Sequence, residues 1–162
     1  MKNIVLIISA FIITTLFASC DLSHYPIDDP AITKIDSGLL GKWREKSKKG
    51  DKDFITITRL NDYKYSIVDK EKGKKSEAMP AHISVINNAR FMNLFIKDSS
   101  DEGYMFYRIH NIDSKAGTFS FSTVKDSIIQ YLYSPAEVRR YFANRLDDPA
   151  FYADTFYMVK MK

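Results

Sequence analysis

The chain has 162 residues, a length that suits one domain, and its single cysteine excludes a disulfide within the chain. The formal net charge of +4 is mild, and without an aromatic and basic recognition module it does not predict nucleic-acid binding. Lysines concentrate in residues 42–52 and 70–75, which we interpret as solvated loops, with contact to anionic glycan or lipid head groups as the alternative.

Residues 1–20 have the pattern of a bacterial export signal. Lys2 precedes an apolar stretch, residues 4–17, which is shorter than the ~20 residues of a membrane-spanning helix. The run from Leu16 to Cys20 resembles the lipobox of bacterial lipoproteins, as found in small Bacteroides-type lipoproteins. The resemblance implies that signal peptide 1–19 is removed and that an acylated Cys20 anchors the exported protein to a bacterial membrane. Inner, outer and surface-exposed placements stay open, and the alternative for Cys20 is a buried structural cysteine.

Residues 20–35 contain two prolines and no sustained periodicity. We interpret them as a lipidated tether that lifts the domain off the bilayer, and residues 36–162 as one folded domain. Within that domain, apolar or alternating segments separated by turn signals predict strands. The expected strands are residues 54–58, 63–68, 81–86, 91–96, 104–109, 118–124 and 155–161.

The spacing of these strands indicates the fold class. Short strands every ~8–12 residues are typical of all-β sandwiches and barrels, and tight sequential hairpins favour an up-and-down meander. Closing the meander removes its exposed edges. The sequence therefore predicts a mainly β protein with an antiparallel barrel of about eight strands and one helix before the last strand.

That helix is predicted from residue 135. Ser134 to Glu137 forms a capping box, in which Ser134 accepts from the Glu137 N–H and the Glu137 side chain reaches back to the Ser134 N–H. Pro135 occupies the first helical position, and apolar residues recur at helical spacing up to Leu146. We expect the helix to lie against the barrel or to cap one of its mouths. Residues 125–133 fit either a strand or a short helix.

The sequence Gly41-Lys42-Trp43 resembles the Gly-x-Trp that opens the first strand of lipocalin-like barrels. This resemblance implies that Trp43 plugs one end of the barrel beneath a basic side chain of the last strand, for which Lys160 and Lys162 are the candidates. Further segments resemble small bacterial lipoproteins with a lipocalin-like barrel and a late helix. They are residues 81–82, 91–94, 105–109 and 134–151. The resemblance implies a fold and no general activity.

The sequence carries no familiar catalytic motif. His82 and His110 lie on separate predicted strands without a local partner. The acidic residues of the segment 98–102 lack the spacing of an EF-hand loop. The sequence therefore predicts no enzyme, no metal site and no cofactor.

Aromatic residues make up 14% of the chain, and six of them could share the inner face of the barrel by strand alternation. These six are Tyr63, Tyr65, Phe91, Phe95, Phe119 and Phe121. They either fill the core or line an apolar cavity for a lipid-like or aromatic ligand. We therefore expect a non-catalytic protein that binds a small hydrophobic or amphipathic ligand at the cell envelope. The alternative is a structural or interaction module of an envelope complex, with a packed core and a partner that the sequence does not identify.

Overall fold

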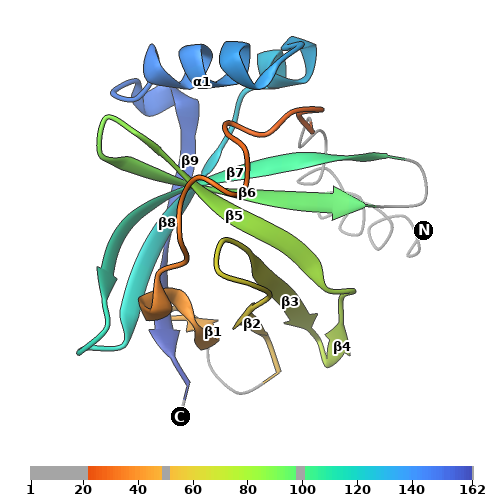
Figure 1. Cartoon of the computed structure of the whole chain (residues 1–162). Coiled ribbons are helices and arrows are strands. Elements are labelled where there is room, and N and C mark those ends of the chain that lie inside the picture. The colour runs from red at the N-terminus through yellow and green to blue at the C-terminus, as the bar shows by residue number, and fades with distance from the viewer. Residues whose placement is uncertain (1–21, 49–51, 98–100, 162) are drawn as a thin grey trace, which may run out of the picture.

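The structure, a computed structural model, describes residues 22–48, 52–97 and 101–161. Within these ranges the chain forms an antiparallel sheet in which consecutive long strands are neighbours. The first strand pairs with both the second and the last, so eight strands close into an up-and-down barrel (Figure 1). One α-helix precedes the last strand. The predicted fold class is confirmed.

The barrel strands are β1 (Gly41–Glu45), β2 (Phe54–Arg59), β3 (Tyr65–Glu71), β5 (Met79–Ile86), β6 (Ala89–Lys97), β7 (Glu102–Asp113), β8 (Thr118–Val124) and β9 (Tyr152–Lys160). A two-residue strand, β4 (Lys74–Lys75), extends the hairpin that follows β3. The α-helix is α1 (Pro135–Ala143), and three 3₁₀ turns are η1 (Ser37–Leu39), η2 (Ser127–Tyr131) and η3 (Pro149–Phe151).

Paired asparagines form the tight turn of the β5–β6 hairpin. Asn87 and Asn88 connect β5 to β6 with positive φ angles of 47° and 69°. A two-residue hairpin turn with positive φ at both central positions matches the right-handed twist of the flanking strands, and asparagine tolerates that backbone better than most residues. The tight turn sets the β5–β6 register, in which Ile83 faces Met92 and both side chains enter the barrel core.

A first hydrophobic core fills the barrel. Its buried members come from every barrel strand and from η1, because alternate residues of each strand point inward. They are Leu39, Trp43, Ile57, Tyr65, Ile67, Ala81, Ile83, Met92, Leu94, Ile109, Phe119 and Met158.

A second core lies outside the barrel, where α1 and η2 cover the outer face of β5, β6 and β7. Phe142 of α1 packs edge-to-face against Phe91 and Phe106, with ring centroids 5.2 and 4.9 Å apart. The buried members of this outer core are Ile27, Ile86, Phe91, Phe106, Val124, Ile129, Val138, Phe142, Leu146 and Phe151. The helix therefore lies against the side of the barrel, one of the two positions that the sequence left open.

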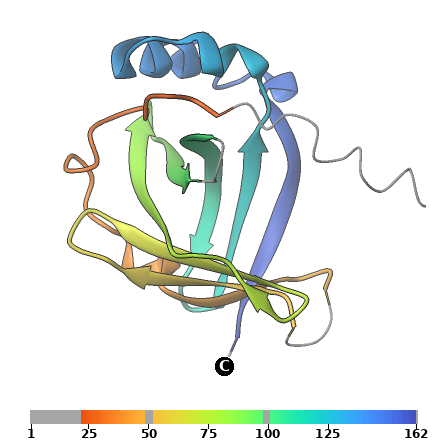
Figure 2. The same ribbon diagram turned by 90° about the vertical axis from the view of Figure 1, so that its right-hand side faces the viewer.

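Residues 22–32, here called the strap, form part of this outer layer (Figure 2). Ile27 is 1% exposed, and its N–H donates to Asn93 Oδ1 over 2.8 Å. The Asp28 carboxylate pairs with Arg139 of α1, with N and O 2.6 Å apart. The segment that the sequence suggested as a tether is thus packed on the barrel from residue 22 onward, because Ile27 adds apolar area to the outer core. Residues 20–21 lie outside the described ranges.

The helix start differs from the predicted capping box in one contact. Ser134 Oγ accepts from the Glu137 N–H over 3.2 Å, and Pro135 takes the first helical position, as predicted. The Glu137 carboxylate, however, accepts from the N–H of Tyr133 over 2.8 Å, one residue earlier than Ser134. The ambiguous segment before α1 forms the 3₁₀ turn η2, which Asp126 caps.

Candidate ligand site at the open end of the barrel

The barrel interior is buried in its middle layer and half-buried at one end, called the open end, whereas Trp43 and η1 cover the other end, called the closed end. Each of the eight strands has a buried inward-facing residue. The next inward-facing residue toward the open end, two positions away, is more exposed than this buried residue. The buried members of these pairs are Trp43, Ile57, Ile67, Ala81, Leu94, Ile109, Phe119 and Met158. Their half-buried counterparts are Glu45, Ile55, Asp69, Met79, Ile96, Tyr107, Phe121 and Phe156. The strand register places these half-buried residues at the same end of the barrel, since Ile55 faces Asp69 and Phe121 faces Phe156.

Trp43 seals the closed end. Its side chain is fully buried, and its indole N–H donates to the Leu39 carbonyl of η1 over 2.8 Å. Lys160 of β9 places its ammonium 5.3 Å from the Trp43 ring centroid, a cation–π arrangement. Of the two lysines suggested for this position, Lys162 lies outside the described residues.

The structure explains why a glycine precedes Trp43 by two residues. Gly41 has a φ of +139°, and a Cβ at this residue would lie 2.6 Å from the Lys160 side chain. A larger residue would therefore displace the lysine from the Trp43 ring. Tyr65 also covers the closed end. Its hydroxyl accepts from the Asp36 N–H over 2.5 Å, and the Asp36 carboxylate forms an ion pair with Arg90.

An aromatic series connects the two ends. Phe119 contacts Trp43 edge-to-face, with ring centroids 4.7 Å apart, and stacks on Phe121 with centroids 5.9 Å apart. At the open end, Phe121 stacks on Phe156 and contacts Tyr107 edge-to-face, over 5.3 and 5.5 Å. A ligand that entered this end would meet flat aromatic faces and flexible methionine and isoleucine side chains.

The structure brings together only half of the six aromatic residues proposed from the sequence. Tyr65 and Phe119 are buried in the barrel core, and Phe121 is packed against it. Tyr63 precedes β3 in the β2–β3 turn, where its N–H donates to Asn61 Oδ1 over 2.9 Å.

The prediction that Phe91 and Phe95 face the barrel interior is wrong, because both lie on the outer face of β6. Phe91 is buried in the outer core against Phe142, and Phe95 lies beside Tyr104, with ring centroids 5.2 Å apart. Their neighbours Met92, Leu94 and Ile96 take the inward positions of β6. The segment 91–96 is nearly all apolar because both of its faces are covered, so hydrophobicity alone could not show which face is inside. For the same reason, the sequence did not identify Tyr107, Phe156, Ile96 and Met79 as inward-facing residues of the open end.

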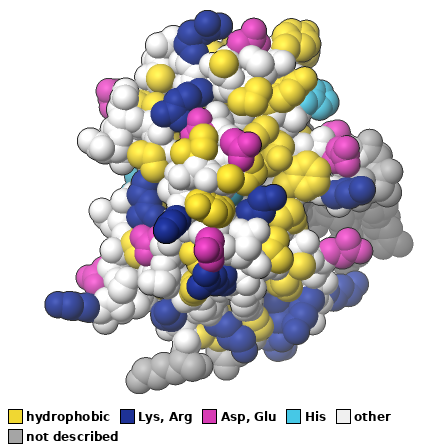
Figure 3. All heavy atoms as spheres, in the orientation of Figure 1, with side chains coloured by type: hydrophobic (Ala, Val, Ile, Leu, Met, Phe, Trp, Pro, Cys, Tyr) yellow, Lys and Arg dark blue, Asp and Glu magenta, His cyan; other side chains and the backbone are white. Residues whose placement is uncertain are grey.

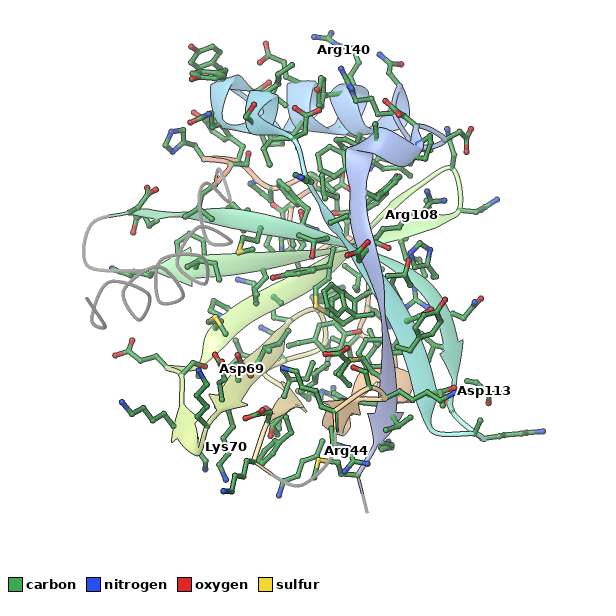
Figure 4. All side chains as sticks on the ribbon, turned by 180° about the vertical axis from the view of Figure 1, so that it is seen from behind. Arg44, Asp69, Lys70, Arg108, Asp113 and Arg140 are labelled. Atoms are coloured by element: carbon green, nitrogen blue, oxygen red, sulfur yellow. The ribbon has the colours of Figure 1, made fainter. Side chains whose placement is uncertain are left out.

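Asp69 is the acidic group among the inward-facing side chains of β3. It faces Ile55 across the β2–β3 pair, whereas the adjacent Lys70 points to the outer face, 5.0 Å from the Phe54 ring centroid (Figure 4). Burial raises the pKa of Asp69, and the negative charges of Glu71 and Asp53 raise it further. This carboxyl group and that of Glu45 are the polar groups among the half-buried inward-facing side chains of the open end.

Exposed lysines lie along one side of the open end. The β1–β2 loop carries Lys46, Lys48 and Lys52, and the β3–β4 hairpin carries Lys72, Lys74 and Lys75. The two loops are joined, because the Lys72 N–H donates to Asp53 Oδ1 over 2.7 Å. Figure 3 shows Lys and Arg side chains gathered at the lower side of the molecule, over β1 to β4.

A hollow of about 370 Å³ lies outside the barrel, between the β5–β6 turn and the C-terminal end of α1. Asn87, Asn88, Arg108 and Asp147 line it, together with Ala89, Ala143 and Leu146. Arg108 is committed to the fold, because it donates to the Leu146 carbonyl over 2.6 Å and lies 5.0 Å from the Tyr152 ring centroid. We therefore assign this hollow no role in ligand binding.

The histidines of the domain have structural partners. His82 is buried under the strap, with Nε2 3.0 Å from the Asp28 carbonyl, and His110 Nε2 lies 2.9 Å from Ser122 Oγ. Burial lowers the pKa of both. Within the described ranges, His, Cys, Asp and Glu side chains form no group of three that could hold a metal ion.

Comparisons with known proteins identify no relative of this chain. A scan against protein-family models found no match, and searches of curated proteins and of solved structures found none either. In the part of the chain that the structure describes, none of the helices is long and apolar enough to cross a membrane.

Proposed function

We propose that this chain is a lipid-anchored protein of the bacterial cell envelope that binds a small hydrophobic or amphipathic ligand without catalysis. The observation that carries the ligand proposal is the gradient of burial along all eight strands. Small-ligand sites in barrels use such an end, lined mainly by apolar and aromatic side chains with a few polar groups. Tyr107, Phe121 and Phe156 supply the aromatic surface, and Asp69 supplies a polar group.

The anchor proposal rests on the sequence from Leu16 to Cys20, which lies outside the described residues. Acyl chains add ~0.8 kcal/mol of membrane affinity per buried CH₂, and two or more chains hold a protein at a bilayer stably. Mass spectrometry of the protein extracted from bacterial membranes tests this part. We expect a chain that begins at Cys20 and carries acyl groups, and an unmodified Cys20 would refute it.

Binding of the neutral dye Nile red tests the ligand site. We expect the dye to bind the folded protein with increased fluorescence and to be displaced by long-chain alcohols. Ile96→Glu places a carboxylate at the open end and should weaken binding at least tenfold. The control Val85→Glu adds the same charge at an exposed position of β5 and should leave binding unchanged.

Absence of dye binding, together with absence of a co-purified ligand in native mass spectrometry, would refute the ligand proposal. That outcome would favour the structural alternative, which the dense packing of the closed end also supports. In that case pull-down from envelope extracts should recover a specific protein partner.

A further inference from the structure

The strap begins at the open end of the barrel. Ser23 is fully buried and forms two backbone hydrogen bonds with Tyr104 of β7, over 3.0 and 2.8 Å. A Cβ on the neighbouring Gly103 would lie 2.7 Å from the Ser23 carbonyl oxygen and 2.8 Å from Leu22 Cβ. Glycine at this position therefore lets the strap approach β7. Gly103 faces Ile96 at the open end, so the start of the strap is fixed there.

The sequence distance between this point and the proposed anchor is short. Cys20 precedes Leu22 by two residues. Even a fully extended chain spans at most ~3.6 Å per residue, so the two Cα atoms lie within about 7 Å of each other. Because Ser23 is held on β7, the proposed acyl groups on Cys20 would be separated from the open end by only this short length of chain.

We propose that the open end of the barrel faces the bilayer, so that the ligand enters the barrel from the lipid. This inference rests on the lipid anchor and the ligand site proposed above, and it adds the orientation and the route. With the first strap residues fixed on the barrel, the anchor has too little free chain to let the domain turn its closed end to the membrane.

The charges at the open end fit an anionic lipid surface. Among the described residues of the β1–β2 loop and the β3–β4 hairpin, six exposed lysines lie at this end, and the hydrogen bond from the Lys72 N–H to Asp53 joins the two loops. Anionic phosphate groups attract such lysine clusters within a Debye length of the bilayer. At the closed end, the β2–β3 and β7–β8 turns carry Lys64 and Lys115, and Lys160 lies over the Trp43 ring.

Exposed apolar side chains border the other side of the open end. η2 follows β8 there, and Ile128, Tyr131 and Tyr133 are 45%, 62% and 75% exposed. Tyrosine suits the boundary between water and lipid, since its ring is apolar and its hydroxyl is polar. Ile129 of η2 shares the outer core with Ile27 of the strap, so this side is continuous with the strap. Figure 3 shows hydrophobic side chains gathered on the right-hand side of the molecule.

Fluorescence quenching in vesicles tests the orientation. The full chain, acylated in a bacterial host, is placed in vesicles of phosphatidylglycerol and phosphatidylcholine that contain a lipid with a nitroxide head group. A thiol-reactive fluorophore is attached at one introduced cysteine in each variant. Tyr133→Cys and Lys74→Cys report on the open end, and Leu60→Cys and Lys115→Cys report on exposed turns at the closed end. The acylated Cys20 does not react with the fluorophore.

We expect the open-end labels to be quenched at least twofold more strongly than the closed-end labels. Equal or reversed quenching with an acylated Cys20, while Nile red still binds, would overturn the orientation alone. An unmodified Cys20 would overturn the anchor and the orientation together. Unquenched open-end labels combined with loss of Nile red binding on acylation would place the anchor's own acyl chain in the barrel, which also overturns the proposal.

Discussion

Asn93 offers a decisive test of how the strap is held on the barrel. This fully buried side chain of β6 points to the outer face, under the strap. Its Oδ1 accepts from the Ile27 N–H over 2.8 Å, and its Nδ2 donates to Ser84 Oγ over 3.0 Å. Asn93→Ala removes both contacts without removing an inward-facing residue of the barrel.

The expected loss of stability follows from these contacts. The buried Ile27 N–H would lose its acceptor, and an unsatisfied buried donor costs about 1–3 kcal/mol. The Ser84 hydroxyl can rotate toward another acceptor and adds less, while the space vacated by the amide adds a further cavity term. We therefore expect Asn93→Ala to lower the free energy of unfolding by about 2–4 kcal/mol. This is a large share of the ~5–15 kcal/mol that holds a typical domain folded.

Urea unfolding followed by circular dichroism measures this loss, and hydrogen exchange locates it. The Ile27 amide should exchange much faster in the variant than in the parent protein. Asn111→Ala is the matched control, since Asn111 is an exposed asparagine of β7 and its loss should change stability by no more than about 0.5 kcal/mol. If both variants lose the same small amount, or if the Ile27 amide stays protected, the strap is held by contacts other than Asn93.

Three further predictions concern the plug, the helix and the buried histidine. Trp43→Ala should lower the free energy of unfolding by about 3–5 kcal/mol in urea, whereas Tyr157→Ala at an exposed position should have little effect. Ser134→Ala removes the cap of α1 and should cost about 1 kcal/mol in thermal unfolding, with the exposed Ser127→Ala nearly neutral. Burial lowers the pKa of His82 below the ~6.5 of an unfolded imidazole, so the unfolded chain binds protons first and stability falls as pH drops below ~6.5. His82→Gln should flatten this loss between pH 7 and 5, and His24→Gln, at an exposed position, should not.

The sequence predicted the elements of the barrel well because their signals are local. The predicted strand 118–124 coincides with β8, and the paired asparagines of the β5–β6 turn adopt the backbone that a tight hairpin needs. Ser134 and Pro135 marked the start of α1 correctly. Alternation, turn chemistry and capping each depend on a few neighbouring residues, so they can be read without knowledge of the tertiary fold.

The inner and outer faces of the sheet could not be predicted in the same way. Phe91 and Met92 are both buried, one under α1 and the other inside the barrel, and nothing in the segment itself distinguishes them. The packing of the strap on the barrel could not be predicted either. It depends on Asn93 and Tyr104, which are more than sixty residues away in the sequence. The open end is a property of all eight strands together, because it depends on the burial of inward-facing residues that are distant in the sequence.

The two cores explain how the barrel can keep one end half-exposed. A domain of this size without disulfides depends on its buried apolar area for its stability. Here Phe142, Phe151, Ile27 and their neighbours bury a second apolar cluster outside the barrel, on the outer face of β5 to β7. Together with the Trp43 plug, this cluster stabilises the strands independently of the open end. The open end, where Phe121 stacks on Phe156, is therefore where the proposed ligand would contact the barrel at the least cost to the fold.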